Sequence, residues 1–159
     1  MIYYAVVHPV LLYGIEVYAN TYSTYLARIK IINNQIIRTA LQADRRTAVR
    51  QLYFSFRSLP IDFLHSFQVL LFMHKFVYNN SQLPDVYNDY FLFNRGLHSY
   101  MTRAANDLHI YSVHTVKGSL CLKFKGAKLW NDLPLILKQT NSFSKFKFKL
   151  WNYLMNGCA

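Results

Sequence analysis

Apolar residues recur at steps of three and four through the first half of the chain, which is the spacing of one face of an α-helix. The clearest run predicts a helix over 22–41, with Thr21 or Ser23 placed to cap its first turn. A helix of this length needs one apolar face packed against other elements. The stripe expected to be buried consists of Tyr22, Tyr25, Leu26, Ile29, Ile32, Ile36, Ile37, Ala40 and Leu41.

Further helices are predicted on both sides of this one. An apolar stretch over 3–18 is interrupted at His8-Pro9, where Pro9 suits the first turn of a helix better than its interior. Helical spacing returns over 49–58, and another helix is expected to open at Pro60 and to end at 79–81. Its stripe is Phe63, Leu64, Phe67, Leu70, Leu71, His74 and Val77.

The second half of the chain has a different pattern. After a short helical turn at Leu83-Pro84, residues 94–99 contain Gly96 and predict a loop. Residues 108–115, and then 120–125 with alternating apolar and polar positions, predict two short strands that pair as an antiparallel hairpin.

Helical spacing returns near the end of the chain. A helical region follows Gly126, pauses at Leu133-Pro134 and resumes after Ser142. Trp130 and Trp151 are assigned to the core, because large aromatic residues at helical spacing pack more often than they bind. The fold class expected is mainly α: a helical bundle over 1–80, then a region over 81–159 with a loop, a short β-hairpin and C-terminal helices.

Composition narrows the classes of function. The chain has 159 residues, of which 53% are hydrophobic, enough for a real core. Its 18 Lys and Arg residues against 7 Asp and Glu leave a formal charge of +11, which favours a polyanionic partner. Cys121 and Cys158 are too few and too far apart for a disulfide framework or a thiolate zinc site. No basic stretch opens the apolar start as a secretory signal would, so we expect a nuclear or cytoplasmic protein with no membrane span.

The acidic residues do not predict a catalytic metal site. Two-metal nucleases and polymerases need several carboxylates that converge on divalent ions, whereas these acids are scattered one at a time. The only close pair, Asp85 and Asp89, is better explained as negative charge at the start of a helix. We therefore expect no enzyme activity, no cofactor and no small-molecule substrate. The acids are Glu16, Asp44, Asp62, Asp85, Asp89, Asp107 and Asp132.

Histidine offers the only other candidate for catalysis. His98, His109 and His114 occur near Asp107 and Cys121, so a zinc site or an acid–base pair is conceivable. Their spacing matches no compact zinc finger, and histidines in loops more often cap, pack or face water. The structural explanation is therefore preferred.

Positive charge is concentrated in two stretches of the chain. Arginine suits bidentate phosphate contact, and lysine acts as a mobile point charge along a backbone. A basic face can also serve only to keep an apolar protein soluble, but such a face more often mixes both signs. The charge therefore favours nucleic acid. The first stretch holds Arg28, Lys30, Arg38, Arg45, Arg46, Arg50 and Arg57, and the second Lys117, Lys123, Lys125, Lys128, Lys138, Lys145, Lys147 and Lys149.

Short motifs are spread in order over nearly the whole chain. In the first half they are Tyr3-Tyr4-Ala5, Leu12-Tyr13-Gly14-Ile15-Glu16, Asn33-Asn34-Gln35-Ile36-Ile37-Arg38, Leu59-Pro60-Ile61 and Leu83-Pro84. In the second half they are His98-x-Tyr100-x-Thr102-Arg103, Gly126 followed by Trp130-Asn131-x-Leu133-Pro134, and Phe146-Lys147-x-x-Leu150. In this order they resemble the region after the polymerase core in reverse transcriptases of non-LTR (LINE-type, jockey-like) retrotransposons.

The resemblance implies a parent that is an RNA-directed DNA polymerase, with this chain as a truncated C-terminal fragment: a thumb-like region over 1–80 and a post-thumb tail over 81–159. The aspartates of the family's catalytic turn precede the matched part, so polymerase activity does not carry over. A thumb lays a helix along the template–primer, and the tail holds backbone or stacks on bases. The expected nucleic-acid-binding residues are Arg28, Lys30, Arg38, Arg45, Arg46, Arg50, Arg57, Tyr100, Arg103, Lys123, Lys125, Lys145 and Lys149.

The expected partners are RNA or DNA, and the missing polymerase core. Two rival functions stay open. One is a helical protein–protein interaction module, whose binding would depend only mildly on salt. The other is a non-functional transposon remnant that collapses without binding anything specifically.

Overall fold

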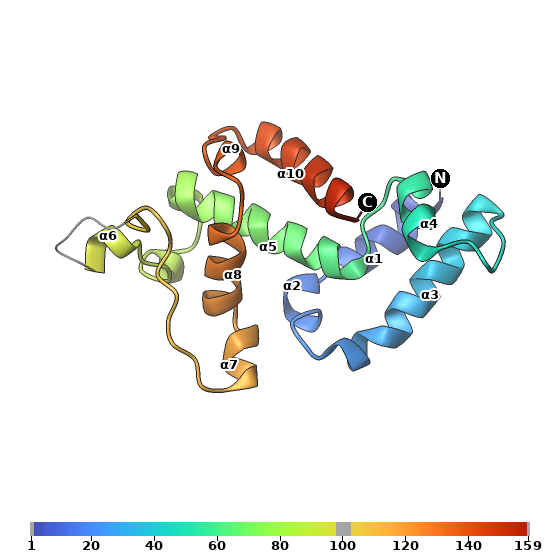
Figure 1. Cartoon of the computed structure of the whole chain (residues 1–159), viewed down its shortest axis with the longest axis horizontal. Coiled ribbons are helices and arrows are strands. Elements are labelled where there is room, and N and C mark those ends of the chain that lie inside the picture. Colours follow the sequence, from blue (N-terminus) through green and yellow to red (C-terminus); the bar gives the residue numbers. More distant parts are fainter. Residues whose placement is uncertain (1, 98–102, 159) are drawn as a thin grey trace. The chain divides into compact units, whose positions relative to one another are not determined.

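The computed structural model describes residues 2–97 and 103–158 and is mainly helical, as predicted (Figure 1). The chain forms two compact units. The first comprises Met1–Gln68 with Leu150–Ala159, and the second comprises Val69–Lys149. The predicted nucleic-acid contact at Tyr100 lies outside the described residues.

The first unit begins with a broken helical segment. A π-helical turn, η1 (Tyr3–Val7), leads into α1 (His8–Leu12), and Pro9 occupies the first turn of α1 as predicted. The segment then breaks at Gly14, whose φ of 67° places it in the left-handed region that glycine adopts without strain. Helix α2 (Ile15–Tyr18) follows this break.

The long helix predicted over 22–41 is confirmed as α3 (Ser23–Leu41). The predicted capping is wrong: Tyr22 is the N-cap residue, and its side chain makes no capping hydrogen bond. The helix ends at Gln42 in a left-handed conformation, and α4 (Val49–Phe56) folds back onto α3 (Figure 1).

The core of the first unit joins η1, α3 and α4. The ring of Tyr3 meets Phe56 edge to face, with 4.9 Å between ring centroids. Polar groups run through the same core: Tyr3 Oη donates to Asn33 Oδ1 at 3.0 Å, and Asn33 Nδ2 donates to Tyr53 Oη at 2.8 Å. Asn33, in the sequence motif over 33–38, therefore links α3 to both η1 and α4. The apolar core cluster consists of Tyr3, Ile37, Leu52, Tyr53 and Phe56.

The buried face of α3 is narrower than predicted. Leu26 and Ile37 are buried, whereas Tyr25 and Ile32 are exposed. The physical reason is that η1 and α4 cover only part of the apolar stripe. The unit therefore leaves apolar side chains of α3 in contact with solvent.

The second unit contains the end of α5 (Ile61–Tyr78), which stops where the sequence predicts. Two 3₁₀ turns follow, η2 (Asn80–Gln82) and η3 (Asp85–Tyr87). The next segment was expected to be a loop, but it forms the single-turn helix α6 (Asn94–Leu97).

The predicted β-hairpin is wrong. In the part of the chain that the structure describes, residues 116–131 form α7 (Val116–Leu120) and α8 (Leu122–Asn131), and Phe93 and Leu108 make only an isolated bridge. Thr115 favours the helix because its Oγ1 accepts from Gly118 N–H at 3.0 Å, a side-chain N-cap. In α8, Gly126, Ala127 and Trp130 are buried at helical spacing, which outweighs the short alternation over 120–125.

The C-terminal helices are α9 (Leu135–Lys138) and α10 (Phe143–Cys158), in agreement with the predicted pause and resumption. Within the second unit, α8 lies close against α5 (Figure 1). A Cβ on Gly126 would lie 2.9 Å from Met73 Sδ, so the glycine permits this approach. Trp130, Phe146 and His74 are buried here. Within residues 2–97 and 103–158, every helix is too short or too polar to serve as a membrane span.

Candidate nucleic-acid interface

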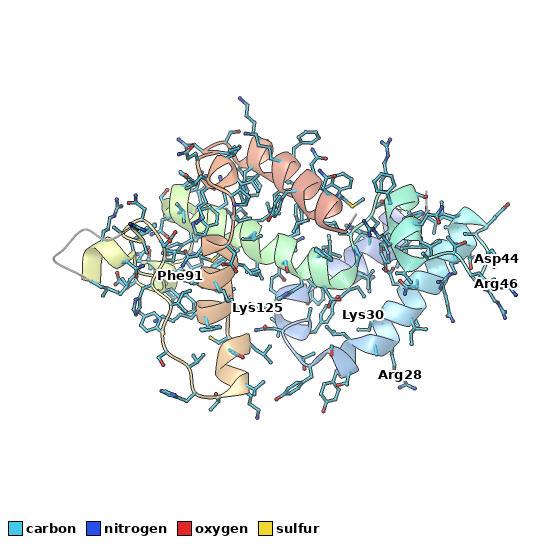
Figure 2. The ribbon with its side chains drawn as sticks, viewed as in Figure 1. Arg28, Lys30, Asp44, Arg46, Phe91 and Lys125 are labelled. Atoms are coloured by element: carbon cyan, nitrogen blue, oxygen red, sulfur yellow. The ribbon has the colours of Figure 1, made fainter. Side chains whose placement is uncertain are left out.

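The three cations predicted on α3 do not share one face. Successive helical residues are rotated by about 100°, so Arg28 and Lys30 are about 200° apart around the axis. Figure 2 shows Arg28 near the start of α3 and Arg46 beyond its other end. Lys30 is half-buried, and its Nζ lies 2.7 Å from Asp62 Oδ2 in an ion pair. Lys30 therefore belongs to the internal packing of the first unit more than to a binding surface.

Arg38 and Arg45 are brought together. Both line one open hollow at the C-terminal end of α3. Arg38 comes from the last turn of the helix, where a cation is favoured by the helix dipole, and Arg45 comes from the loop that follows. The hollow holds no carboxylate, so its charge is positive. It is lined by Gln35, Arg38, Thr39, Gln42, Ala43 and Arg45.

The loop after α3 is held by its own hydrogen bonds. Arg38 Nη2 donates to Thr47 O at 3.4 Å, and Thr47 N–H donates to Asp44 O at 3.1 Å. The Asp44 carboxylate accepts from Arg46 N–H at 2.7 Å, which is a typical turn-forming contact of aspartate. Figure 2 shows Asp44 and Arg46 on this same loop. The one acid of the region therefore has a structural role in shaping the loop.

We call the segment from the end of α3 to the start of α4, which carries Arg38, Arg45, Arg46 and Arg50, the basic corner. Arg45 and Arg46 are exposed in the loop, and Arg50 is exposed in the first turn of α4. Arg38 is half-buried, so its position is fixed more firmly than that of the others. Arg57 is also exposed but caps the far end of α4, with φ of 54°.

The predicted tail residues do not form one surface either. Lys123 is half-buried, with its Nζ 4.1 Å from the ring centroid of Tyr111 and 5.6 Å from that of Tyr90. This ammonium is therefore held by aromatic rings, a cation–π arrangement. Lys125 is half-buried on α8 (Figure 2). Arg103 is exposed in a turn before α7.

Two predicted lysines lie on the exposed face of α10. Lys145 and Lys149 are one helical turn apart, as the sequence predicts, and both are exposed. Lys149 Nζ also donates to Thr140 Oγ1 at 3.2 Å. They form a second basic patch, on the second unit.

Arg95, which lies outside the two basic stretches of the sequence, is placed at a pocket. Arg95 is exposed on α6, and its guanidinium carbon lies 5.1 Å from the ring centroid of Phe93. Both residues line a pocket in the second unit, together with Trp130. The prediction that Trp130 belongs to the core is confirmed, since it is buried, but no spacing in the sequence signals that it also borders a pocket.

The candidates for catalysis are dispersed. Among residues 2–97 and 103–158, no group of three or more His, Cys, Asp or Glu side chains is placed to hold a metal ion. His109 Nδ1 lies 3.3 Å from Asn94 Oδ1, and His114 is exposed, while His98 lies outside the described residues. The pKa shifts belong to buried packing: burial raises the pKa of Tyr53 to about 12 and lowers the pKa of His74.

A search of family models, of curated proteins and of solved structures found no match to this chain. Its function is therefore inferred from the charge, burial and geometry of its own residues.

Proposed function

We propose that this chain binds nucleic acid without catalysing a reaction, and that the basic corner of the first unit is its main contact surface. The observation that carries this proposal is that Arg38 and Arg45 line one hollow without a carboxylate. Arg46 and Arg50 are exposed on the segment that continues from it. Four arginines within thirteen positions, opposed by Asp44 alone, favour an anion with repeated charges.

The geometry suits phosphate more than an isolated carboxylate. Arginine offers several donors in a planar fork and binds phosphate oxygens in pairs. Arg38 is held by Thr47 O, so less side-chain entropy is lost when it binds a ligand. Arg45 and Arg46 are exposed, so their side chains can adjust to the phosphodiester backbone of a bound nucleic acid. Contacts of this kind position a strand but carry no sequence information.

We also propose that the chain corresponds to the thumb and post-thumb region of a retrotransposon RNA-directed DNA polymerase. The support is the order of the short motifs along the sequence. Asn33 and Asn34 of the 33–38 motif link η1, α3 and α4 through hydrogen bonds to Tyr3 and Tyr53. These two motif residues therefore have a structural role in the first unit. The natural partners of such a region are RNA, DNA and the polymerase core.

The test reverses two exposed charges of the basic corner. Arg45→Glu combined with Arg46→Glu is expected to weaken binding of single-stranded RNA about tenfold or more at low salt. The slope of log K against log salt should become shallower by about 0.7 for each phosphate contact that is lost. Fluorescence anisotropy with a labelled oligonucleotide, titrated at several salt concentrations, measures both quantities.

The matched control changes the net charge equally at another place. Lys117→Glu combined with Lys128→Glu reverses two exposed lysines on α7 and α8 of the second unit. A general effect of net charge predicts equal losses for the two double variants. Equal losses, or an unchanged salt slope in the arginine variant, would remove the basic corner from the interface.

A second candidate function is the docking of a helix from another protein. It is favoured by an apolar surface on η1 and α1, where Ile2, Val6 and Val10 are exposed at steps of four residues. An open apolar groove lies between this segment and α3, and Ile32 and Ile36 line it. Exposed apolar patches of this kind mark protein interaction sites.

The two candidates differ in their response to salt and to substitution. Val6→Ser combined with Val10→Ser is expected to abolish docking of a protein helix and to leave RNA binding unchanged. Docking through apolar contact should also vary little between low and high salt. Pull-down with the polymerase core of a retrotransposon, compared between wild type and this variant, is the measurement. If the wild type and the Val6→Ser, Val10→Ser variant capture the polymerase core equally, this apolar surface is not the docking site.

A further inference from the structure

The second unit contains a pocket of about 250 Å³ with aromatic walls and a charged rim. Tyr78, Phe93 and Trp130 contribute aromatic rings from α5, from the segment before α6 and from α8. Arg95, Asp107 and Lys138 contribute charge. Drug-sized ligands occupy pockets of roughly 300–1,000 Å³, so this pocket suits a smaller group.

The pocket is held by hydrogen bonds on several sides. Asn131 clamps the backbone of Leu108, donating to its carbonyl at 2.8 Å and accepting from its N–H at 2.9 Å. Asn94 N–H donates to Asp107 O at 3.0 Å. Tyr78 Oη donates to the carbonyl of Lys138. The walls are therefore preorganised, which lowers the entropy lost when a ligand binds.

Two charged groups face each other within the pocket. Lys138 Nζ donates to Asn131 O at 2.7 Å and to Asp107 Oδ1 at 3.2 Å. An ionised carboxylate has about four acceptor positions, so Asp107 keeps the capacity to accept from a ligand. The amides of Asn106 and Gln139 border the same space. The pocket thus offers both donors and acceptors beside aromatic rings.

Arg95 stands at the rim of this pocket. Its guanidinium lies over the Phe93 ring, and its backbone N–H donates to Ala105 O at 3.0 Å. The side chain is exposed, so a ligand can reach it. A cation next to an aromatic wall is the arrangement that binds a base together with its phosphate.

We propose that this pocket takes up one unstacked nucleobase, with Arg95 at the phosphate attached to it. A base is flat and presents donors and acceptors on its edge, which matches the Asp107 and amide groups beside the rings. A free phosphate would leave the aromatic walls without a function, and an aliphatic ligand would leave the remaining acceptor positions of Asp107 unused. The inference goes beyond the proposed function, because it places a base-binding site in the second unit, apart from the phosphate contacts of the basic corner.

The test uses nucleoside 5′-monophosphates on the whole chain, with ribose 5-phosphate as the probe that lacks a base. Ligand-observed saturation-transfer NMR is expected to show transfer to the base protons of at least one nucleotide and none to ribose 5-phosphate. Leu135 lines the pocket and is 69% exposed, so Leu135→Trp fills the entrance without disturbing the core. This variant should lose at least four-fifths of the transfer.

A neighbouring residue provides the matched control. Ile136 is 74% exposed and does not line the pocket, so Ile136→Trp should bind as the wild type does. Arg95→Gln should weaken binding of the monophosphate about threefold to fivefold and leave binding of the nucleoside unchanged. Circular dichroism spectra that match the wild type establish that each variant is folded.

Several results would overturn this proposal. One is transfer to ribose 5-phosphate as strong as transfer to a nucleotide, and another is no transfer to any nucleotide base. A third is that a folded Leu135→Trp variant shows wild-type transfer and Arg95→Gln binds the monophosphate as tightly as the wild type does. The proposed function fails separately, if Arg45→Glu with Arg46→Glu leaves the affinity and salt slope of RNA binding unchanged.

Discussion

Asn33 is a polar residue in the core of the first unit, where its amide is hydrogen-bonded on both sides. Its Oδ1 accepts from Tyr3 and its Nδ2 donates to Tyr53 Oη, which in turn donates to Asn34 Oδ1 at 2.8 Å. Removing one partner of a buried polar group lowers the free energy of unfolding by more than the intact hydrogen bond adds to it, because the other group is left unsatisfied away from water. The hydroxyl of Tyr53 is therefore a sensitive point of the fold.

Tyr53→Phe is expected to lower the free energy of unfolding by about 1–3 kcal/mol, because it leaves the buried Asn33 Nδ2 without an acceptor. Urea denaturation followed by circular dichroism measures the loss. Tyr25→Phe is the control, since Tyr25 is exposed on α3 and should change stability by less than about 0.5 kcal/mol. Equal stability of the two variants would contradict the role given to this network.

The burial of His74 is expected to make the free energy of unfolding fall in acid. Its ring is fully buried and stacked on Phe146 at 4.3 Å, and its Nε2 lies 2.7 Å from Thr140 O, so Nε2 carries the proton of the neutral ring. Burial lowers the pKa of His74 below its ordinary 6.5. The unfolded chain therefore binds a proton more readily than the folded chain. Stability from this group is present above pH 6.5 and is lost as the pH falls below that value.

The measurement is the free energy of unfolding between pH 8 and pH 5. Wild type should lose stability over this range, by at most about 1.4 kcal/mol per pH unit for one proton. His74→Gln should be less stable at pH 8 but should vary less with pH, because the amide does not titrate. If both proteins lose the same amount between pH 8 and pH 5, His74 is not the group responsible.

At the scale of elements, helices with a long apolar stripe were predictable and short alternating segments were not. The runs that became α3, α5 and α10 are each at least sixteen residues long, so the helical period is clear. Residues 120–125 alternate over only six positions, which fits a strand or a helix equally. Thr115 caps α7, and in α8 the close approach of Gly126 to Met73 is a tertiary contact that no local pattern reports.

Gly126→Val tests that approach. A Cβ at this position would meet Met73 Sδ at 2.9 Å and Leu122 Cδ1 at 3.4 Å, so either the buried Met73 side chain or α8 itself would have to shift. The expected loss is about 1–3 kcal/mol of unfolding free energy. Gly157→Val is the matched control, because nothing lies within 4 Å of a Cβ at Gly157 in α10. Thermal denaturation of both variants should give a clearly lower midpoint for Gly126→Val only.

At the scale of the whole molecule, the sequence predicted the sign of the charge and its two concentrations, but not which cations meet. Residues that stand together in the sequence separated in the structure: Lys30 pairs with Asp62, and Lys123 lies against Tyr111. Arg38 and Arg45 met because α3 ends at Gln42 and the chain turns back there. Such pairings depend on tertiary contacts, which a pattern along one chain does not contain.

The sequence predicted the basic charge of the molecule but not the apolar surface on its first unit. Val6 and Val10 belong to the apolar stretch over 3–18, yet both are exposed on the first unit. The basic corner and this apolar surface therefore offer two different kinds of contact. Their dependence on salt separates them, since phosphate contacts release counterions and apolar contacts do not.

The central claim is that the basic corner binds the phosphates of a nucleic acid, and a salt titration of the wild type beside the Arg45→Glu, Arg46→Glu variant, whose slope should be shallower, tests it most directly. The dissociation constant for a single-stranded RNA would be measured by fluorescence anisotropy from about 50 to 200 mM salt. With three or four phosphate contacts, the slope of the logarithm of the association constant, the reciprocal of this dissociation constant, against log salt should be about −2 to −3. A slope close to zero, or no binding at the lowest salt, would contradict the claim.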